Sequence, residues 1–154
     1  MTALAVVLAV MAGAPPPLPE CPAQRVAHKA LRGDYGKLAQ WQREGYQAFA
    51  DGQPKFLRAW RTYYSAHEGR QGQVDALGGR CDPTRTLAAN ALPMRSYVLI
   101  LGPETKLRQV RDRGAKRNDR VFAHRRGLDI WIDEHTANRR LLQAGGPVQI
   151  AVVH

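Results

Sequence analysis

Metal-binding patterns are absent from this sequence of 154 residues. It has only two cysteines, Cys21 and Cys81, no CxxC or HExxH pattern, and five histidines scattered along the chain. Cysteine and histidine ligands of zinc normally lie at short, fixed spacings. We therefore predict no metal and no other cofactor.

Acidic residues are scarce. The chain has 13 Asp and Glu against 23 Lys and Arg, a net charge of +10. Such a charge attracts polyanions: nucleic acid, anionic lipid headgroups or an acidic cell-wall polymer. Nine basic and two acidic residues lie between Lys106 and Arg126, which is either a solvated loop or a rim that attracts an anionic polymer. A nucleic-acid partner is the less favoured alternative, because there is no helix-turn-helix, zinc-finger or RNP motif and no aromatic interleaving in the basic run.

Hydrophobic runs long enough to span a membrane are also missing. The apolar run Thr2–Ala14 is shorter than the roughly 20 residues that a spanning helix needs. It resembles the apolar core of a secretory signal, and Ala12-Gly13-Ala14 resembles a cleavage site. No basic residue precedes the run and Pro15 follows it, so an uncut anchor is the alternative. We predict an exported protein, located in the periplasm, the cell envelope or outside the cell, with residues 1–14 as signal or anchor.

Export would allow Cys21 and Cys81 to form a disulfide. The bond would close a loop of about 60 residues and contribute roughly 4 kcal/mol through chain entropy. In a cytosolic chain the same residues would be two unrelated thiols. We predict the Cys21–Cys81 disulfide as a consequence of export.

The pattern predicts three further segments after residue 14. Residues 15–23 form a Pro-rich linker, because five of the ten prolines lie between Pro15 and Pro22. Residues 24–55 form a helical segment, since apolar residues recur at spacings of 4, 4, 3 and 3. Gly33, Gly36 and Gly45 weaken that helix. Residues 56–154 form a β-rich domain. The residues of the apolar stripe are Ala27, Leu31, Tyr35, Leu38 and Trp41.

Six short runs rich in β-branched, aromatic or aliphatic residues indicate strands. Six short strands predict a mainly β fold, a small closed six-stranded barrel. A helix is expected to begin at Asp133 as its cap, to bury Ala137, Leu141 and Leu142, and to end at Gly145-Gly146-Pro147. The expected strands are Trp60–Ser65, Arg85–Ala89, Ser96–Leu101, Leu107–Arg111, Leu128–Ile132 and Val148–Val153.

Motifs in residues 60–153 resemble, in order, those of the three-aspartate (3D) domain found in MltA-type lytic transglycosylases and stationary-phase muralytic proteins. The resemblance implies a double-psi β-barrel and cleavage of peptidoglycan glycan strands. Rare lipoprotein A-like proteins are close kin, and Asp112-Arg113-Gly114 resembles their turn. Expansins and barwin-like proteins share the barrel, and many of them only bind polysaccharide. The motifs are Thr62-Tyr63-Tyr64, Asp75–Gly79, Thr86–Pro93, Val110–Gly114, Gly127–Trp131 and Val148–Val152.

The resemblance also implies the site. Asp129 matches the acid/base of the transglycosylases, and Asp112 matches the aspartate of the D-x-G turn. Asn90 stands where the family has its first aspartate, and Gly79 stands where the kin family has a glutamate. Both are departures, and they leave an inactive polysaccharide-binding module as the alternative function. The remaining expected substrate contacts are Thr62, Tyr64, Trp131 and Arg113.

A lytic transglycosylase can act with a single acid, because the sugar's own 6-hydroxyl attacks and no outside water is required. That acid must be protonated, which burial favours. Asp129 has the more apolar neighbours and shares a predicted strand face with Trp131, so we expect it to be the proton donor. Asp112, between Arg111 and Arg113, is expected to stay ionised as its partner. The structural alternatives are a turn cap for Asp112 and a half-exposed surface position for Asp129.

Overall fold

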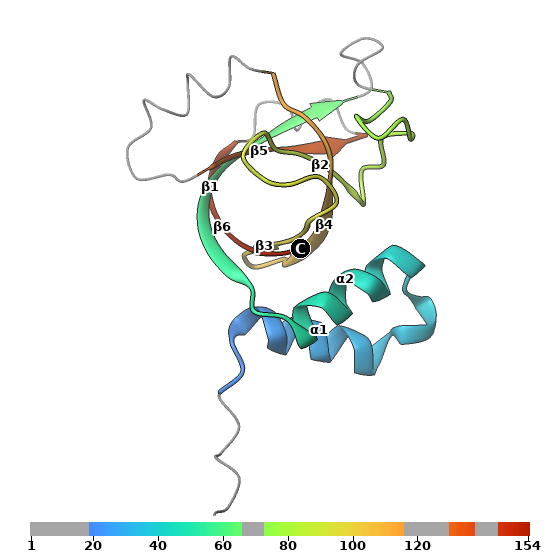
Figure 1. The fold of residues 1–154 in the computed structure, drawn as a ribbon, viewed down its shortest axis with the longest axis vertical. Helices are drawn as coiled ribbons and strands as arrows, with labels where there is room; N and C mark the ends of the chain where they lie inside the picture. The colour runs from blue at the N-terminus through green and yellow to red at the C-terminus, as the bar shows by residue number, and fades with distance from the viewer. Residues whose placement is uncertain (1–18, 66–72, 116–129, 138–144) are drawn as a thin grey trace, which may run out of the picture.

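The described residues fold into a closed β-barrel preceded by two helices, as the computed structural model shows for residues 19–65, 73–115, 130–137 and 145–154 (Figure 1). The strand order around the barrel is β1-β5-β2-β4-β3-β6. The prediction of a mainly β, six-stranded barrel after a helical segment is confirmed. The elements are α1 (Pro22–Gly33), the 3-10 turn η1 (Tyr35–Lys37), α2 (Gln40–Asp51), β1 (Lys55–Ser65), β2 (Thr86–Ala88), β3 (Tyr97–Leu101), β4 (Lys106–Asp112), β5 (Ile130–Thr136) and β6 (Gly146–Val153).

Strand pairing in the barrel has an internal two-fold regularity. β1 pairs in parallel with β5, and β2 pairs in parallel with β4. The other four pairings are antiparallel: β1–β6, β2–β5, β3–β4 and β3–β6. If each strand is exchanged for the one three places away along the chain, the same six pairings result. The first three strands and the last three therefore have equivalent positions in the barrel.

Alternation along each strand separates the barrel interior from its outer face. Ala59 of β1 and Ile130 and Ile132 of β5 belong to one buried apolar cluster with Val98 and Ile150. The intervening residues of β1 and β5 therefore point outward. This alternation places a row of aromatic and polar side chains on the outer face of the barrel. They are Trp60, Thr62, Tyr64, Trp131, Asp133 and His135.

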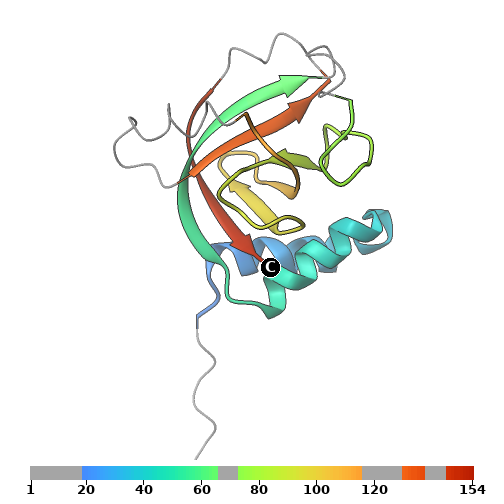
Figure 2. The same cartoon turned by 45° about the horizontal axis from the view of Figure 1, so that its top comes forward.

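The helices cover the outer face of β3, β4 and β6 (Figures 1 and 2). Ala27 and Phe49 are fully buried in a second apolar cluster with Leu99. Gly45 allows this close contact, since a Cβ atom there would lie 2.7 Å from Tyr97 Cδ1. The second half of β1 runs side by side with β5 on another part of the barrel wall, away from the helices (Figure 2).

The helical segment differs from the single helix with one apolar stripe expected for residues 24–55. Two helices are joined by η1, and the stripe residue Tyr35 is 55% exposed at the connection. Pro22, assigned to the linker, is the first residue of α1. Proline suits this position because the first helical N–H has no partner within the helix.

The predicted helix beginning at Asp133 is wrong at its start. β5 continues to Thr136, and Asp133 pairs with Thr62 of β1 and with Ala88 of β2. Pairing with strands on both sides overrides the local capping signal of an aspartate. Leu141 and Leu142 lie outside the described residues.

A charged cluster fills one end of the barrel interior. The buried Glu134 carboxylate lies 2.5 Å from Arg108 Nη2, 3.9 Å from Lys106 Nζ and 4.0 Å from Arg61 Nη1. The Arg108 side chain is also largely buried and donates a hydrogen bond to the Thr84 carbonyl at 2.8 Å. The excess positive charge of the chain therefore extends into its core.

Both cysteines are free thiols, so the predicted disulfide is not formed. Cys21 is the N-cap of α1 and packs with the apolar cluster beneath the helices. Cys81 lies beside Tyr64 and Asp112, where it interacts with both. The two thiols therefore lie in different clusters of the fold. The number of residues between them in the sequence does not indicate this separation.

Candidate functional site

One row of residues crosses four neighbouring strands on the outer face of the barrel. Thr62 of β1 pairs with Asp133 of β5, which pairs with Ala88 of β2, and Ala88 pairs with Asp112 of β4. Neighbouring strands lie about 4.8 Å apart, so the two aspartate Cα atoms are separated by roughly 10 Å. Ala88, which pairs with both aspartates and has only a methyl side chain, lies between them in this row, next to a register shift in the β2–β4 pairing.

Asp133 is held by two side chains of the same face. The Thr62 hydroxyl and the Trp131 indole N–H both donate hydrogen bonds to Asp133 Oδ1, the latter at 2.8 Å. Asp133 is 8% exposed. The predicted substrate contacts Thr62 and Trp131 thus converge on an acid that sequence reasoning assigned to a helix cap.

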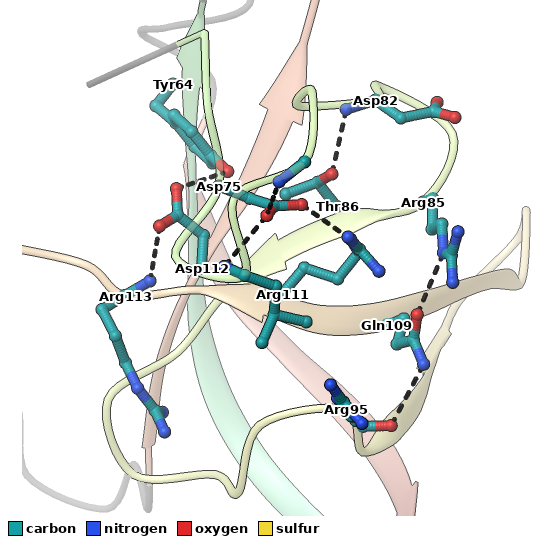
Figure 3. Close-up of polar contacts among 12 residues, drawn as sticks. Tyr64, Asp75, Asp82, Arg85, Thr86, Arg95, Gln109, Arg111, Asp112 and Arg113 are labelled. Carbon is teal, nitrogen blue, oxygen red and sulfur yellow. Dashed lines mark hydrogen bonds and ion pairs between the residues drawn. The ribbon is translucent and has the colours of Figure 1, made fainter. Parts of the chain in front are cut away.

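Asp112 is held at the end of β4. The Tyr64 hydroxyl donates a hydrogen bond to Asp112 Oδ2 at 3.3 Å, and the Arg113 backbone N–H donates to Oδ1 at 2.9 Å (Figure 3). Burial, reinforced by the Asp112 charge, raises the pKa of Tyr64 well above its ordinary value. Tyr64 therefore remains a proton-bearing donor to the carboxylate at any physiological pH.

The two arginines that flank Asp112 have other partners. Arg111 Nε donates to Asp75 Oδ2 at 2.7 Å. The Arg113 guanidinium donates to the carbonyl oxygens of Ala89 and Leu92. Both guanidinium groups are therefore hydrogen-bonded to partners other than the Asp112 carboxylate, and their effect on its charge stays a prediction. Figure 3 shows the Arg113 side chain extending away from the Asp112 carboxylate.

The backbone next to Asn90 is hydrogen-bonded to the backbone of Asp112. The Ala89 N–H donates to the Asp112 carbonyl at 3.2 Å, and Arg113 fastens the same turn through the carbonyl of Leu92. Asp129 lies outside the described residues. Of the three residues expected to share a groove, the backbone hydrogen bond brings the turn that contains Asn90 next to Asp112, and the third is not described, so the shared groove stays a prediction.

The position of the missing glutamate is occupied. A Cβ atom at Gly79 would lie 2.8 Å from Arg111 Nη2 and 3.4 Å from Asp75 Oδ2. The fully buried Asp75 carboxylate also accepts hydrogen bonds from the backbone N–H groups of Leu77 and Gly79. An acid is therefore present beside Gly79, but its hydrogen bonds hold the loop.

His135 and Cys81 adjoin the Tyr64 side chain. The His135 ring meets the Tyr64 ring edge-on, with centroids 4.8 Å apart. Burial lowers the pKa of His135, although the Asp112 charge opposes this effect. Burial and the Asp112 charge both raise the pKa of the Cys81 thiol. Both groups are therefore biased towards their neutral forms.

Sequence reasoning missed several residues of this face: Trp60, Asp75, Cys81, Asp133 and His135. Two of them, Asp133 and His135, were detectable, because they alternate with Trp131 as the outward residues of one longer strand. Asp75 and Cys81 carry no such signal, since they reach the site from an irregular loop.

Within the described residues, no group of three or more His, Cys, Asp and Glu side chains could hold a metal ion. None of the described helices is long and apolar enough to cross a membrane. No model of a known protein family matches the chain, and no curated protein matches its sequence. What the arrangement offers chemically is two oriented carboxylates with hydroxyl and indole groups on one barrel face.

Proposed function

We propose that this protein is an exported double-psi β-barrel that binds peptidoglycan glycan strands and cleaves their β-1,4 glycosidic bonds in the manner of a lytic transglycosylase. The two-fold regularity of the strand pairing supports the double-psi assignment. The positive charge of the chain suits an exported protein that acts on an anionic wall polymer.

The observation that carries the proposal is the placement of Asp112. It lies in register with Asp133 on the outer face of the barrel, and the Tyr64 hydroxyl orients its carboxylate. Glycosidic cleavage requires a carboxyl group beside the scissile bond and a second group that stabilises the developing positive charge of the sugar. An outward-facing, oriented aspartate meets the second requirement.

In the proposed reaction Asp129 protonates the leaving glycosidic oxygen. The ionised Asp112 stabilises the oxocarbenium-like centre. Asp129 then accepts the proton of the sugar's 6-hydroxyl as that oxygen attacks the anomeric carbon. This transfer regenerates the protonated form of Asp129, and an anhydro-sugar end is formed without water or metal. Asn90, beside Asp112, hydrogen-bonds sugar hydroxyl groups in place of the missing aspartate.

An inactive wall-binding module is the second candidate, and one observation favours it. The place of the missing glutamate at Gly79 is filled by the Asp75–Arg111 ion pair, whose hydrogen bonds hold the loop. Such a domain would use the same face to bind glycan strands and leave them intact.

Clearing of purified peptidoglycan sacculi tests the proposal. We expect the wild-type protein to reduce the turbidity of the suspension, Asp129→Asn to abolish clearing and Asp112→Asn to leave a residual rate. Co-sedimentation with sacculi should persist in both variants, because an amide keeps the shape of the carboxyl group. Asp34→Asn in the exposed helical connection is the matched control. Near-wild-type clearing by Asp129→Asn would contradict the assigned acid.

A further inference from the structure

We propose that Trp60 and Trp131 form a subsite that stacks against the apolar face of a neutral pyranose ring. The inference rests on the proposed function for the kind of polymer, a glycan strand, and adds where one of its sugars binds. It holds for a cleaving enzyme and for a binding module alike.

The two indoles lie directly opposite each other on neighbouring strands. Trp60 of β1 pairs with Trp131 of β5, their ring centroids are 6.3 Å apart and their planes differ by 29°. Both are partly exposed. The next outward pair along the same strands is Thr62 and Asp133. Two residues along a strand span roughly 7 Å, so a ring on the indoles lies beside the Asp133 carboxylate.

The orientation of the Trp131 ring is fixed by polar contacts. The Trp131 indole N–H donates to Asp133 Oδ1 at 2.8 Å, and Thr62 binds the same oxygen atom. Asp133 is itself nine-tenths buried, so it cannot swing away with the indole. A preorganised ring loses little conformational freedom on binding, which favours affinity.

This combination of groups matches a sugar ring. A pyranose presents C–H groups on its faces, which stack on an aromatic surface, and hydroxyl groups at its edge, which need hydrogen-bonding partners. Indole rings supply the first requirement, and Thr62 with Asp133 supplies the second.

The third tryptophan serves as a contrast. Trp41 lies on α2 and packs with the apolar cluster between the helices and the barrel, with the Arg85 guanidinium 5.4 Å from its ring centroid. This position indicates that Trp41 contributes to the packing of the helices on the barrel. Trp41→Phe is therefore a control of the same residue type, located away from the proposed subsite.

The test is calorimetric titration of the full chain with a soluble β-1,4 oligomer of N-acetylglucosamine, a neutral probe that separates stacking from charge attraction. We expect Trp60→Ala and Trp131→Ala each to weaken binding about tenfold, the size of one aromatic contact. Trp131→Phe should recover part of the loss, and Trp41→Phe should bind as the wild type does. Asp133→Leu, which removes the acceptor of the indole N–H, should weaken binding by a smaller factor. Circular dichroism identifies variants that fail to fold. If an alanine variant does not fold, the affinity of folded Trp131→Phe is compared with that of the wild type in its place.

Undiminished binding by folded Trp60→Ala and Trp131→Ala, or no binding of the oligomer by the wild type, would overturn the subsite. Sacculus clearing is measured on the same variants. A wild-type protein that clears sacculi while its tryptophan variants bind normally refutes the subsite and leaves the proposed cleavage standing. Binding through the tryptophans without clearing supports the subsite and refutes the cleavage.

Discussion

The Tyr64 hydroxyl donates a hydrogen bond to Asp112 Oδ2 at 3.3 Å, which links the outer face of β1 to the end of β4. The contact spans two intervening strands, β5 and β2. It fixes the direction of a carboxylate that otherwise terminates a strand.

Removing that hydroxyl should impair cleavage more than binding. We expect Tyr64→Phe to lower the rate of sacculus clearing roughly fivefold, because one hydrogen bond to a carboxylate contributes about 1 kcal/mol. The rate is measured by turbidity and binding by co-sedimentation. Tyr35→Phe, at an exposed position on the helical connection, is the control and should change neither. Equal clearing by both variants would remove Tyr64 from the site.

Stability should fall as the solution becomes acidic because of His135. Burial lowers the pKa of His135 in the folded protein below its ordinary value of 6.5. The unfolded chain therefore binds a proton at a higher pH than the folded chain does, and stability rises with pH between the two values. This contribution is complete above about pH 6.5 and is lost as the pH falls towards the lowered pKa.

Urea unfolding of the wild type and His135→Gln between pH 5 and 8 checks this linkage. The variant should show a flatter dependence of the free energy of unfolding on pH across that window. Parallel curves for the wild type and His135→Gln would contradict the assignment.

The interior ion pair should be costly to break and cheaper to replace. Glu134→Leu leaves the largely buried Arg108 without its carboxylate, so we expect a loss of about 3–5 kcal/mol in the free energy of unfolding. Adding Arg108→Met should recover much of that loss, because a matched apolar pair needs no charge compensation. Denaturant unfolding measures both. A double variant less stable than Glu134→Leu would show that the arginine contributes through other contacts.

Gly45 should be sensitive to a substitution that normally strengthens a helix. Alanine is favoured over glycine in a helix by about 1 kcal/mol. A Cβ atom at residue 45, however, would lie 2.7 Å from Tyr97 Cδ1 and 2.9 Å from Leu107 Cδ2. We expect Gly45→Ala to lower the melting temperature and Gly33→Ala, where nothing lies within 4 Å, to leave it unchanged or raise it. A rise for Gly45→Ala would mean that α2 shifts without cost.

The strands were predictable because a small barrel repeats a simple pattern. Each of the six β-like runs overlaps an observed strand, and Ile130 and Ile132 lie on the same, interior face of β5 as expected. The extension of β5 to Thr136 was not predictable from local signals. It depends on seven paired positions with β1, whose sequence lies about 70 residues earlier.

The candidate site was predictable only where a motif marked it. Asp112, Thr62, Tyr64 and Trp131 were named from the sequence, and the structure gives each a hydrogen bond on the outer face. The partners of Arg111 and Arg113 were not predictable, because adjacency along the chain says nothing about where a long side chain ends. Arg111 crosses to Asp75, whose loop has no regular pattern.

Glycan cleavage is the central claim, and the identity of the soluble products tests it most directly. Purified peptidoglycan is incubated with the wild-type protein, and the released fragments are analysed by mass spectrometry before and after chemical reduction. We predict disaccharide fragments that end in an anhydro-sugar, lighter by one water than hydrolysed fragments and resistant to reduction, and no such fragments from Asp129→Asn. Sacculi that retain the bound protein and release no glycan fragments would contradict it.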